Sequence, residues 1–155
     1  MNRAIVSAIA ALFAVGCGSK DNISLSAALS NVSLTVTEQA LGTQLSGGFD
    51  LYLEVGGQAD GTATVELGNF SIKRDSATLV DGVQVLPQGV SFPLKLGKGD
   101  KKTVPFDLDD SALLPASDKA NLCSGPVQLV GAVTHDLNGG ETTPVQGPAA
   151  VPSGC

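Results

Sequence analysis

The sequence has no tryptophan, and aromatic residues make up only 4% of its 155 residues. It contains a single histidine, His135, and its three cysteines never stand in the Cys-x-x-Cys spacing of zinc and redox sites. The Gly-x-Ser-x-Gly motif that carries the nucleophile of many hydrolases is also absent from the sequence. These absences predict a protein that is not an enzyme and that uses neither a cofactor nor a metal.

Basic residues are scarce as well. The chain has 9 Lys and Arg against 15 Asp and Glu, for a formal net charge of −6, and the acids are spread along it. Nucleic-acid binding needs a basic face, so we expect no nucleic-acid partner. Asp107, Asp109 and Asp110, with Asp118 further on, offer oxygen ligands for calcium, but they lack the spacing of the helical calcium loop. That departure favours a solvated acidic loop.

The first seventeen residues have the parts of a secretory signal. Arg3 supplies a positive start, residues 4–15 are apolar except for Ser7, and small residues precede Cys17. This apolar run is shorter than the roughly 20 residues of a membrane-spanning helix. We therefore expect the chain to be exported. This segment could be a plain secretion signal or an anchor helix that stays attached. The residues around Cys17 favour a third interpretation.

Residues 14–17, Ala-Val-Gly-Cys, resemble the lipobox of bacterial lipoproteins, with Ala14 in the place of the usual leucine. The resemblance implies that a signal peptide of residues 1–16 is removed and that Cys17 carries lipid, palmitate included. Residues 17–22 then form a lipidated tether, and residues 23–155 form the domain. In that family a residue such as Gly18 directly after the cysteine resembles the signal for sorting to the outer membrane. The resemblance implies a protein of a bacterial outer membrane, and it leaves open on which face of that membrane the domain lies. Several acyl chains would anchor the protein stably in the membrane, whereas a single chain would bind it only marginally.

The cysteine count predicts a disulfide. If Cys17 carries lipid, Cys123 and Cys155 remain as an even pair in an oxidising compartment. Such a bond, closing a loop of about 30 residues, stabilises by roughly 3–4 kcal/mol in the chain-entropy model.

The last hairpin is predicted to support this pairing. Residues 127–133 alternate, and residues 138–140, Asn-Gly-Gly, suit a three-residue turn centred on Gly139. In that register Cys123 lies opposite Cys155, within disulfide range. In this register the nitrogens of three prolines, which carry no hydrogen, face away from the partner strand. This is typical of an edge strand, and the three are Pro144, Pro148 and Pro152.

Alternation of apolar and polar residues marks the other strands, most clearly over residues 49–55. Slips in the alternation at residues 30–31 and 68–69 indicate bulges; the first slip could also mark a strand that changes sheets, and the second a two-residue hairpin. Glycines predict turns at residues 45–48 and 56–61. We find no helical period after Cys17 beyond one possible turn in residues 111–114.

Residues 92–96 and 104–108 flank a glycine-rich turn and share one parity of apolar residues. A hairpin that places Pro93 opposite Pro105 would leave no ladder donor missing. The two strands could instead lie in different sheets. Before them, residues 83–89 suggest a short edge strand.

About seven short strands without intervening helices predict an all-β fold, a single immunoglobulin-like antiparallel β-sandwich after a helical signal peptide. The chain resembles the immunoglobulin-like modules of bacterial surface lipoproteins, with residues 94–107 similar to their strand-turn-strand around a glycine-rich loop. It is more weakly similar to the β-sandwich of water-stress proteins of the late-embryogenesis-abundant type 2 class. Neither resemblance identifies a ligand.

Two polar motifs suggest chemistry and also have simpler interpretations. His135 and Asp136 are neighbours on a strand and so point to opposite faces, which favours a structural or exposed histidine over a catalytic one. Residues 97–103 superficially resemble a phosphate loop, but their spacing differs from it and no helix follows. Their lysines, Lys98, Lys101 and Lys102, form a basic tip that either solubilises the hairpin or contacts an anionic partner.

The sequence thus predicts a non-catalytic, lipid-anchored cell-envelope protein that acts as a binding or structural module. Its partners would be the membrane, through the anchor at Cys17, and a protein or other envelope component that contacts its loops. A stress-protective coat protein of the water-stress type is the first alternative. A small envelope hydrolase with residues drawn from distant loops is the second.

Overall fold

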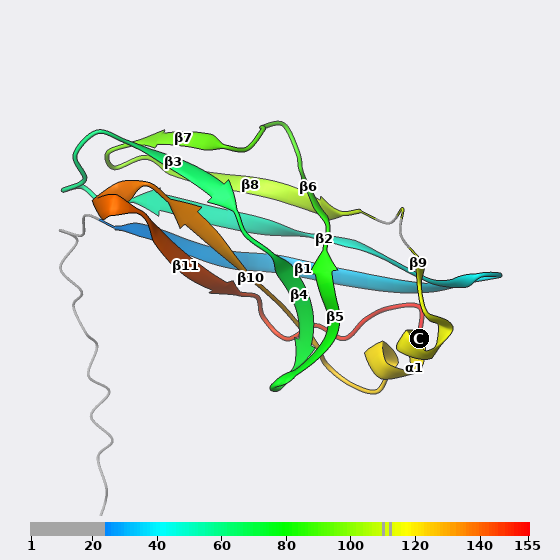
Figure 1. The fold of residues 1–155 in the computed structure, drawn as a ribbon. Coiled ribbons are helices and arrows are strands. Elements are labelled where there is room, and N and C mark those ends of the chain that lie inside the picture. Colours follow the sequence, from blue (N-terminus) through cyan, green and yellow to red (C-terminus); the bar gives the residue numbers. More distant parts are fainter. Residues whose placement is uncertain (1–23, 110, 112) are drawn as a thin grey trace, which may run out of the picture.

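The computed structural model describes residues 24–109, 111 and 113–155. These residues form two antiparallel sheets packed face to face (Figure 1). The prediction of an all-β antiparallel sandwich is therefore confirmed. The predicted signal peptide, Cys17 and the tether up to residue 22 lie outside the described residues. Within the described part of the chain, no helix is long and apolar enough to cross a membrane.

The first sheet is built on the two longest strands. β1 pairs with β2, β2 with β8 and β8 with β6, while β9 pairs with β2 beyond the end of β8. The strands of this sheet are β1 (Leu25–Gln39), β2 (Gly42–Val55), β6 (Val85–Pro87), β8 (Lys101–Leu108) and β9 (Leu113–Leu114).

The second sheet is centred on β10. β11 pairs along one side of β10, and β3 and β4 follow each other along its other side. β7 then pairs with β3, and β5 pairs with β4. The strands of this sheet are β3 (Thr62–Leu67), β4 (Phe70–Arg74), β5 (Ala77–Val83), β7 (Leu94–Gly97), β10 (Gln128–His135) and β11 (Glu141–Gln146).

The hydrophobic core lies between the facing sides of the two sheets. Phe49, Leu51 and Leu53 on β2 are at most 3% exposed, as their alternation predicted. The ring of Phe49 stacks on that of Phe106 in the neighbouring strand, with centroids 4.9 Å apart, and lies 5.5 Å from that of Phe70 in the opposite sheet. These aromatic contacts join the two sheets at the middle of the sandwich.

Both slips in the alternation are bulges. β1 has one extra residue relative to β2 between Ser30 and Ser33, where Asn31 has a φ of 52°. β3 and β4 pair with β10 and not with each other, so residues 68–69 interrupt one strand path and do not turn a hairpin.

The predicted turn at residues 45–48 is wrong, because these residues continue β2; the chain turns at residues 40–41. Gly47 has a φ of +139°, and a Cβ there would collide with the backbone of Ser33 on β1. A Cβ at Gly48 would lie 2.6 Å from the carbonyl oxygen of Phe106. The two glycines therefore permit a close approach of three strands.

The predicted hairpin around residues 97–101 is also wrong, and its strands lie in different sheets. β7 pairs with β3, whereas β8 pairs with β2. Val55, at the end of β2, exchanges backbone hydrogen bonds with residues 99 and 100, so the connection is held beside β2 while the chain crosses between sheets. Phe92 and Phe106 still meet, with ring centroids 5.8 Å apart, but not as partners in a ladder.

The last hairpin forms with a register two residues away from the predicted one. His135 pairs with Glu141, so the hairpin is centred on Asn138 and not on Gly139. The loop is wider than predicted because residues 137–139 form a short 3-10 helix, η1 (Leu137–Gly139), in which Asn138 has a φ of 54°. A shift of two residues leaves the side chains of β11 on the face that the alternation predicted.

β11 occupies an edge of the second sheet, as predicted, and pairs only with β10 among the described strands. The N–H of Gly147 donates to the carbonyl of Leu129 on β10 (2.8 Å), so the nitrogen of Pro144, which has the opposite parity, faces away from β10. Pro152 differs from the prediction: it is buried where the chain leaves this sheet.

A short helix was not predicted. α1 (Ala116–Cys123) follows Pro115, and residues 113–114, where a helical turn was expected, belong to β9. Only Leu122 of this helix is buried, which explains why its residues show no helical period.

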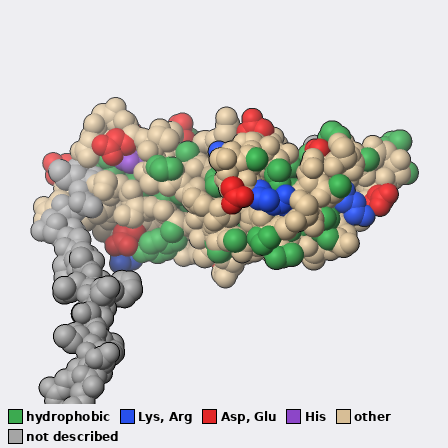
Figure 2. All heavy atoms as spheres, turned by 90° about the horizontal axis from the view of Figure 1, so that it is seen from below, with side chains coloured by type: hydrophobic (Ala, Val, Ile, Leu, Met, Phe, Trp, Pro, Cys, Tyr) green, Lys and Arg blue, Asp and Glu red, His purple; other side chains and the backbone are tan. Residues whose placement is uncertain are grey.

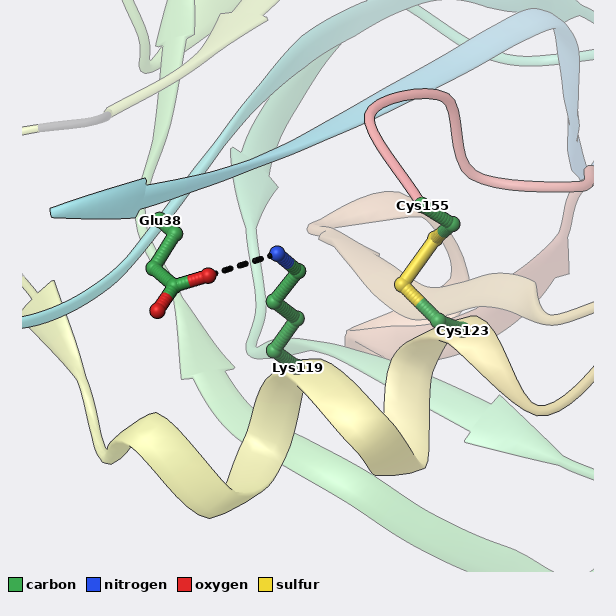
Figure 3. A network of polar contacts seen from close by, with 4 residues as sticks. All are labelled: Glu38, Lys119, Cys123 and Cys155. Carbon is green, nitrogen blue, oxygen red and sulfur yellow. Dashed lines mark hydrogen bonds and ion pairs between the residues drawn. A yellow bond between two sulfur atoms is a disulfide. The ribbon is translucent and has the colours of Figure 1, made fainter.

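The C-terminal tail closes one side of the sandwich. After β11 the chain crosses to the first sheet, where the N–H of Ser153 donates to the carbonyl of Leu34 on β1 (2.9 Å). Cys155 then bonds to Cys123 at the end of α1 (Figure 3), with their Cα atoms 5.5 Å apart. The predicted disulfide is confirmed, but it joins the tail to a helix and does not bridge two paired strands.

Candidate functional site

The described domain has two distinct ends. At the proximal end, the carbonyl of Ser24 accepts the N–H of Gly56 (3.0 Å), so the first described residue lies beside the loops at residues 56–61 and 97–100. The distal end carries the β1–β2 turn at residues 40–41, together with β9 and α1 (Figure 1). β1, which runs between these ends, has 15 residues. At about 3.3 Å per residue it spans roughly 50 Å.

The basic tip formed by Lys98, Lys101 and Lys102, which we call the lysine tip, lies at the proximal end. Lys101 makes an ion pair with Glu54 (3.0 Å), and this hydrogen bond raises the pKa of Lys101. Glu54 also accepts the hydroxyl of Tyr52 (2.6 Å), which raises the pKa of Tyr52. Solvent screens an exposed pair of this kind, so it contributes little to stability. Figure 2 shows acidic side chains close to basic ones here, so this end is not uniformly basic.

His135 and Asp136 have separate neighbours. The side chain of His135 is completely buried on the core face of β10, and neither ring nitrogen has a hydrogen-bond partner among the described residues. Its Nε2 lies 3.9 Å from a carboxylate oxygen of Glu141. The carboxylate of Asp136 instead accepts the N–H of Thr64 (2.7 Å), which lowers the pKa of Asp136.

The acidic residues considered for calcium have separate neighbours. Asp107 accepts a hydrogen bond from Gln88 (2.8 Å), and Asp109 accepts the N–H of Ser111 (2.9 Å), which lowers the pKa of Asp109. Asp118 lies on α1, and Asp110 lies outside the described residues. In the part of the chain that the structure describes, no group of three or more His, Cys, Asp or Glu side chains could hold a metal ion.

The distal end exposes apolar side chains. Leu41 in the β1–β2 turn is 90% exposed and Leu113 on β9 is 45% exposed. These two leucines and Ala40 line a shallow depression that also includes Ser111. Figure 2 shows apolar side chains at this end of the molecule, on the right of the view. We call Ala40, Leu41 and Leu113 the distal apolar surface. Sequence analysis missed it because the turn was placed at residues 45–48.

A more enclosed cavity of about 170 Å³ opens beside this surface, where β5 of the second sheet faces the first sheet. Its apolar walls are Leu45, Val80, Val83, Leu108 and Leu114. Asp81 and Asp109 also line it, and Ser111 lines both the cavity and the neighbouring depression. The distal end therefore combines an exposed apolar surface with a cavity that has carboxylates among its lining residues.

The β1–β2 hairpin that carries Leu41 is held in place by α1. Lys119 on α1 makes an ion pair with Glu38 on β1 (2.9 Å), and this contact lowers the pKa of Glu38 (Figure 3). The disulfide ties the end of the same helix to the tail, and the tail bonds to β1. The helix, the tail and the hairpin thus support one another at the distal end.

No model of a known protein family matches this chain, and no curated protein matches it either.

Proposed function

We propose that the protein is a non-catalytic, lipid-anchored protein of the bacterial outer membrane that acts as a binding module. Lipid at Cys17 would hold the proximal end at the membrane, since residues 18–23 reach at most about 20 Å when extended. The distal end would then stand away from the lipid and meet another envelope component.

The observation that carries this proposal is the exposure of Leu41 at the end of the sandwich opposite Ser24. A hairpin turn in water normally carries Gly, Asn, Asp, Ser or Pro, each of which suits the turn geometry or water. Here the turn residues are Ala40 and Leu41, and the half-exposed Leu113 lies beside them. Apolar side chains gathered in this way are typical of a contact surface.

The lysine tip supports the anchored end of the proposal more weakly. Lys98, Lys101 and Lys102 stand beside Ser24, so they would face the membrane headgroups or an anionic partner near them. Because Lys101 is already paired with Glu54, we assign these lysines a secondary role.

Crosslinking in intact cells tests the proposal. A photoreactive residue at position 41 should crosslink to another envelope protein, and one at Thr78, on exposed β5, should do so much less. Mass spectrometry of the same material should find acyl chains on Cys17. Crosslinks from position 41 to this protein or to lipid alone would favour the structural coat alternative, and an unmodified thiol at Cys17 would overturn the lipid anchor.

A further inference from the structure

The cavity at the distal end has the size of a small ligand site. Leu45 and Leu108, on its first-sheet side, are 6% and 5% exposed. Val80, Val83 and Leu114 are only half-buried, so they leave apolar surface open to the cavity of about 170 Å³. Apolar cavities near 150 Å³ bind ligands such as benzene. A ligand group of about six carbon atoms therefore fits here.

The shape of β5 keeps this cavity open. Its register on β4 shifts twice, and Gly82 has a φ of +65°. Such irregularities bend a strand and disrupt its ladder locally. The chain then leaves β5 for β6 in the other sheet, and the N–H of Asp109 donates to the carbonyl of Gln84 (2.9 Å), which closes one side of the cavity.

The described charged residues that line the cavity are both acidic. Asp81 is exposed on β5, and Asp109 is held by the N–H of Ser111. No Lys or Arg is among the described residues that line the cavity. Since the whole chain is acidic as well, an anionic ligand would be repelled and a cationic group would be attracted.

We infer that this cavity binds a small aliphatic amine, with its alkyl chain between the two sheets and its ammonium group at Asp81 and Asp109. The inference names a ligand class for the proposed binding module, so it rests on the proposal that the protein binds a ligand. It does not depend on the lipid anchor or on contacts made by Leu41.

Titration with three six-carbon compounds tests the inference. Full-length protein in zwitterionic lipid nanodiscs is titrated with hexylammonium, hexanol and hexanoate, and empty nanodiscs supply the background for each compound. We expect hexylammonium to bind roughly fivefold more tightly than hexanol, because a charge contact near the surface is screened by solvent and adds only modestly to affinity. Hexanoate should bind least, and added salt should reduce the preference for the amine. Equal binding of all three compounds, or no binding, would overturn the inference.

Two variants and a matched control locate the site. The double variant Asp81→Asn, Asp109→Asn should abolish the preference for hexylammonium over hexanol while hexanol binds as before, because the amide oxygen introduced at position 109 still accepts the N–H of Ser111. Asp60→Asn, an exposed position at the proximal end, is the matched control and should keep the preference.

Val83→Phe should fill the cavity and weaken the binding of both hexylammonium and hexanol, with a melting curve to verify folding. An unchanged preference in the double variant would place the amine elsewhere. Failed crosslinking at position 41 with intact amine binding would instead count only against the partner surface.

Discussion

Arg74 connects three parts of the chain at a single residue. Its guanidinium donates to the carbonyls of Gly125 (2.9 Å), Leu122 (3.2 Å) and Pro126 (3.2 Å), and also to the hydroxyl of Ser124. The carbonyl groups at the end of a helix lack partners within the helix, and a positive charge there also complements the helix dipole. Arg74 on β4 thus holds the end of α1 and the segment that leads into β10.

We expect Arg74→Ala to lower the free energy of unfolding by about 2–3 kcal/mol, because several partly buried carbonyls lose a charged donor. Arg74→Lys should restore only part of the loss, since an ammonium cannot reproduce the planar fork of donors. Urea unfolding followed by circular dichroism measures both variants. Lys95→Ala, an exposed control, should stay within about 0.5 kcal/mol of the wild type. A similar small change in Arg74→Ala would contradict this role.

His135 is a buried polar residue without hydrogen-bond partners among the described residues. Burial of an unpaired polar group costs roughly 1–3 kcal/mol. We therefore expect His135→Leu to leave the free energy of unfolding unchanged or to raise it by about 1 kcal/mol. Thermal and urea unfolding measure the change. A loss of about 2 kcal/mol or more would show that the imidazole has a stabilising partner, and loss of a hydrolytic activity in the same variant would favour the enzyme alternative.

At the scale of elements, α1 and the C-terminal tail form a clasp over the distal end of the first sheet. The tail bonds to Leu34 and Val36 on β1, and a Cβ at Gly154 would collide with the carbonyl of Val36. The disulfide then joins this tail to α1. The helix and the tail have little buried surface of their own, and each is stabilised by being tied to the other and to β1.

Removal of the disulfide should release this clasp. The double variant Cys123→Ser, Cys155→Ser opens a loop with a sequence separation of 32 residues. The chain-entropy model gives a loss of roughly 3–4 kcal/mol for a loop of this length. Urea unfolding of the variant and of reduced wild type should agree. If the wild type showed free thiols at both positions after denaturation without reductant, the bond and this prediction would both be wrong.

At the scale of the whole molecule, the sandwich separates its two ends by the length of β1. The proximal end starts at Ser24 beside the lysine tip, and the distal end carries the apolar surface and the cavity. A protein anchored at Cys17 would therefore present its binding features away from its own membrane.

Fluorescence quenching in proteoliposomes tests this orientation. A fluorescent amino acid placed at position 98 should be quenched by brominated lipids more strongly than one placed at position 41, because roughly 50 Å of strand separates the two ends. Replacement of Cys17 by Ser removes the proposed anchor and should abolish quenching at both positions. Stronger quenching at position 41 would mean that the distal end faces the lipid.

Much of the strand pattern follows from the sequence. A period of two residues determines which side chains face the core, so the burial of every second residue in 49–55 was predictable. The alternation does not identify the partner of a strand. For that reason the predicted hairpin around residues 97–101 paired β7 with β8, although these strands lie in different sheets. The register of the last hairpin was wrong by two residues for a different reason, because the alternation does not show the 3-10 turn that widens its loop.

The candidate site was less predictable than the fold. Gly47 and Gly48 suggested a turn, and only the approach of Ser33 and Phe106 shows that they belong inside β2. This misplacement concealed the turn at residues 40–41 and with it the distal apolar surface. The cavity combines residues from β2, β5, β8 and β9, which no local pattern links.

By itself the sequence determined that the domain is built mainly from strands, which face of each clear strand meets the core, and the pairing of Cys123 with Cys155, because side-chain period and cysteine count are local or countable properties. Its signal motif at Cys17 stays a prediction of the sequence alone. The tertiary structure decided which strands pair, where the chain changes sheets and what each end exposes. Those outcomes depend on contacts between residues far apart in the chain, whose cost in loop closure and gain in packing no local pattern contains.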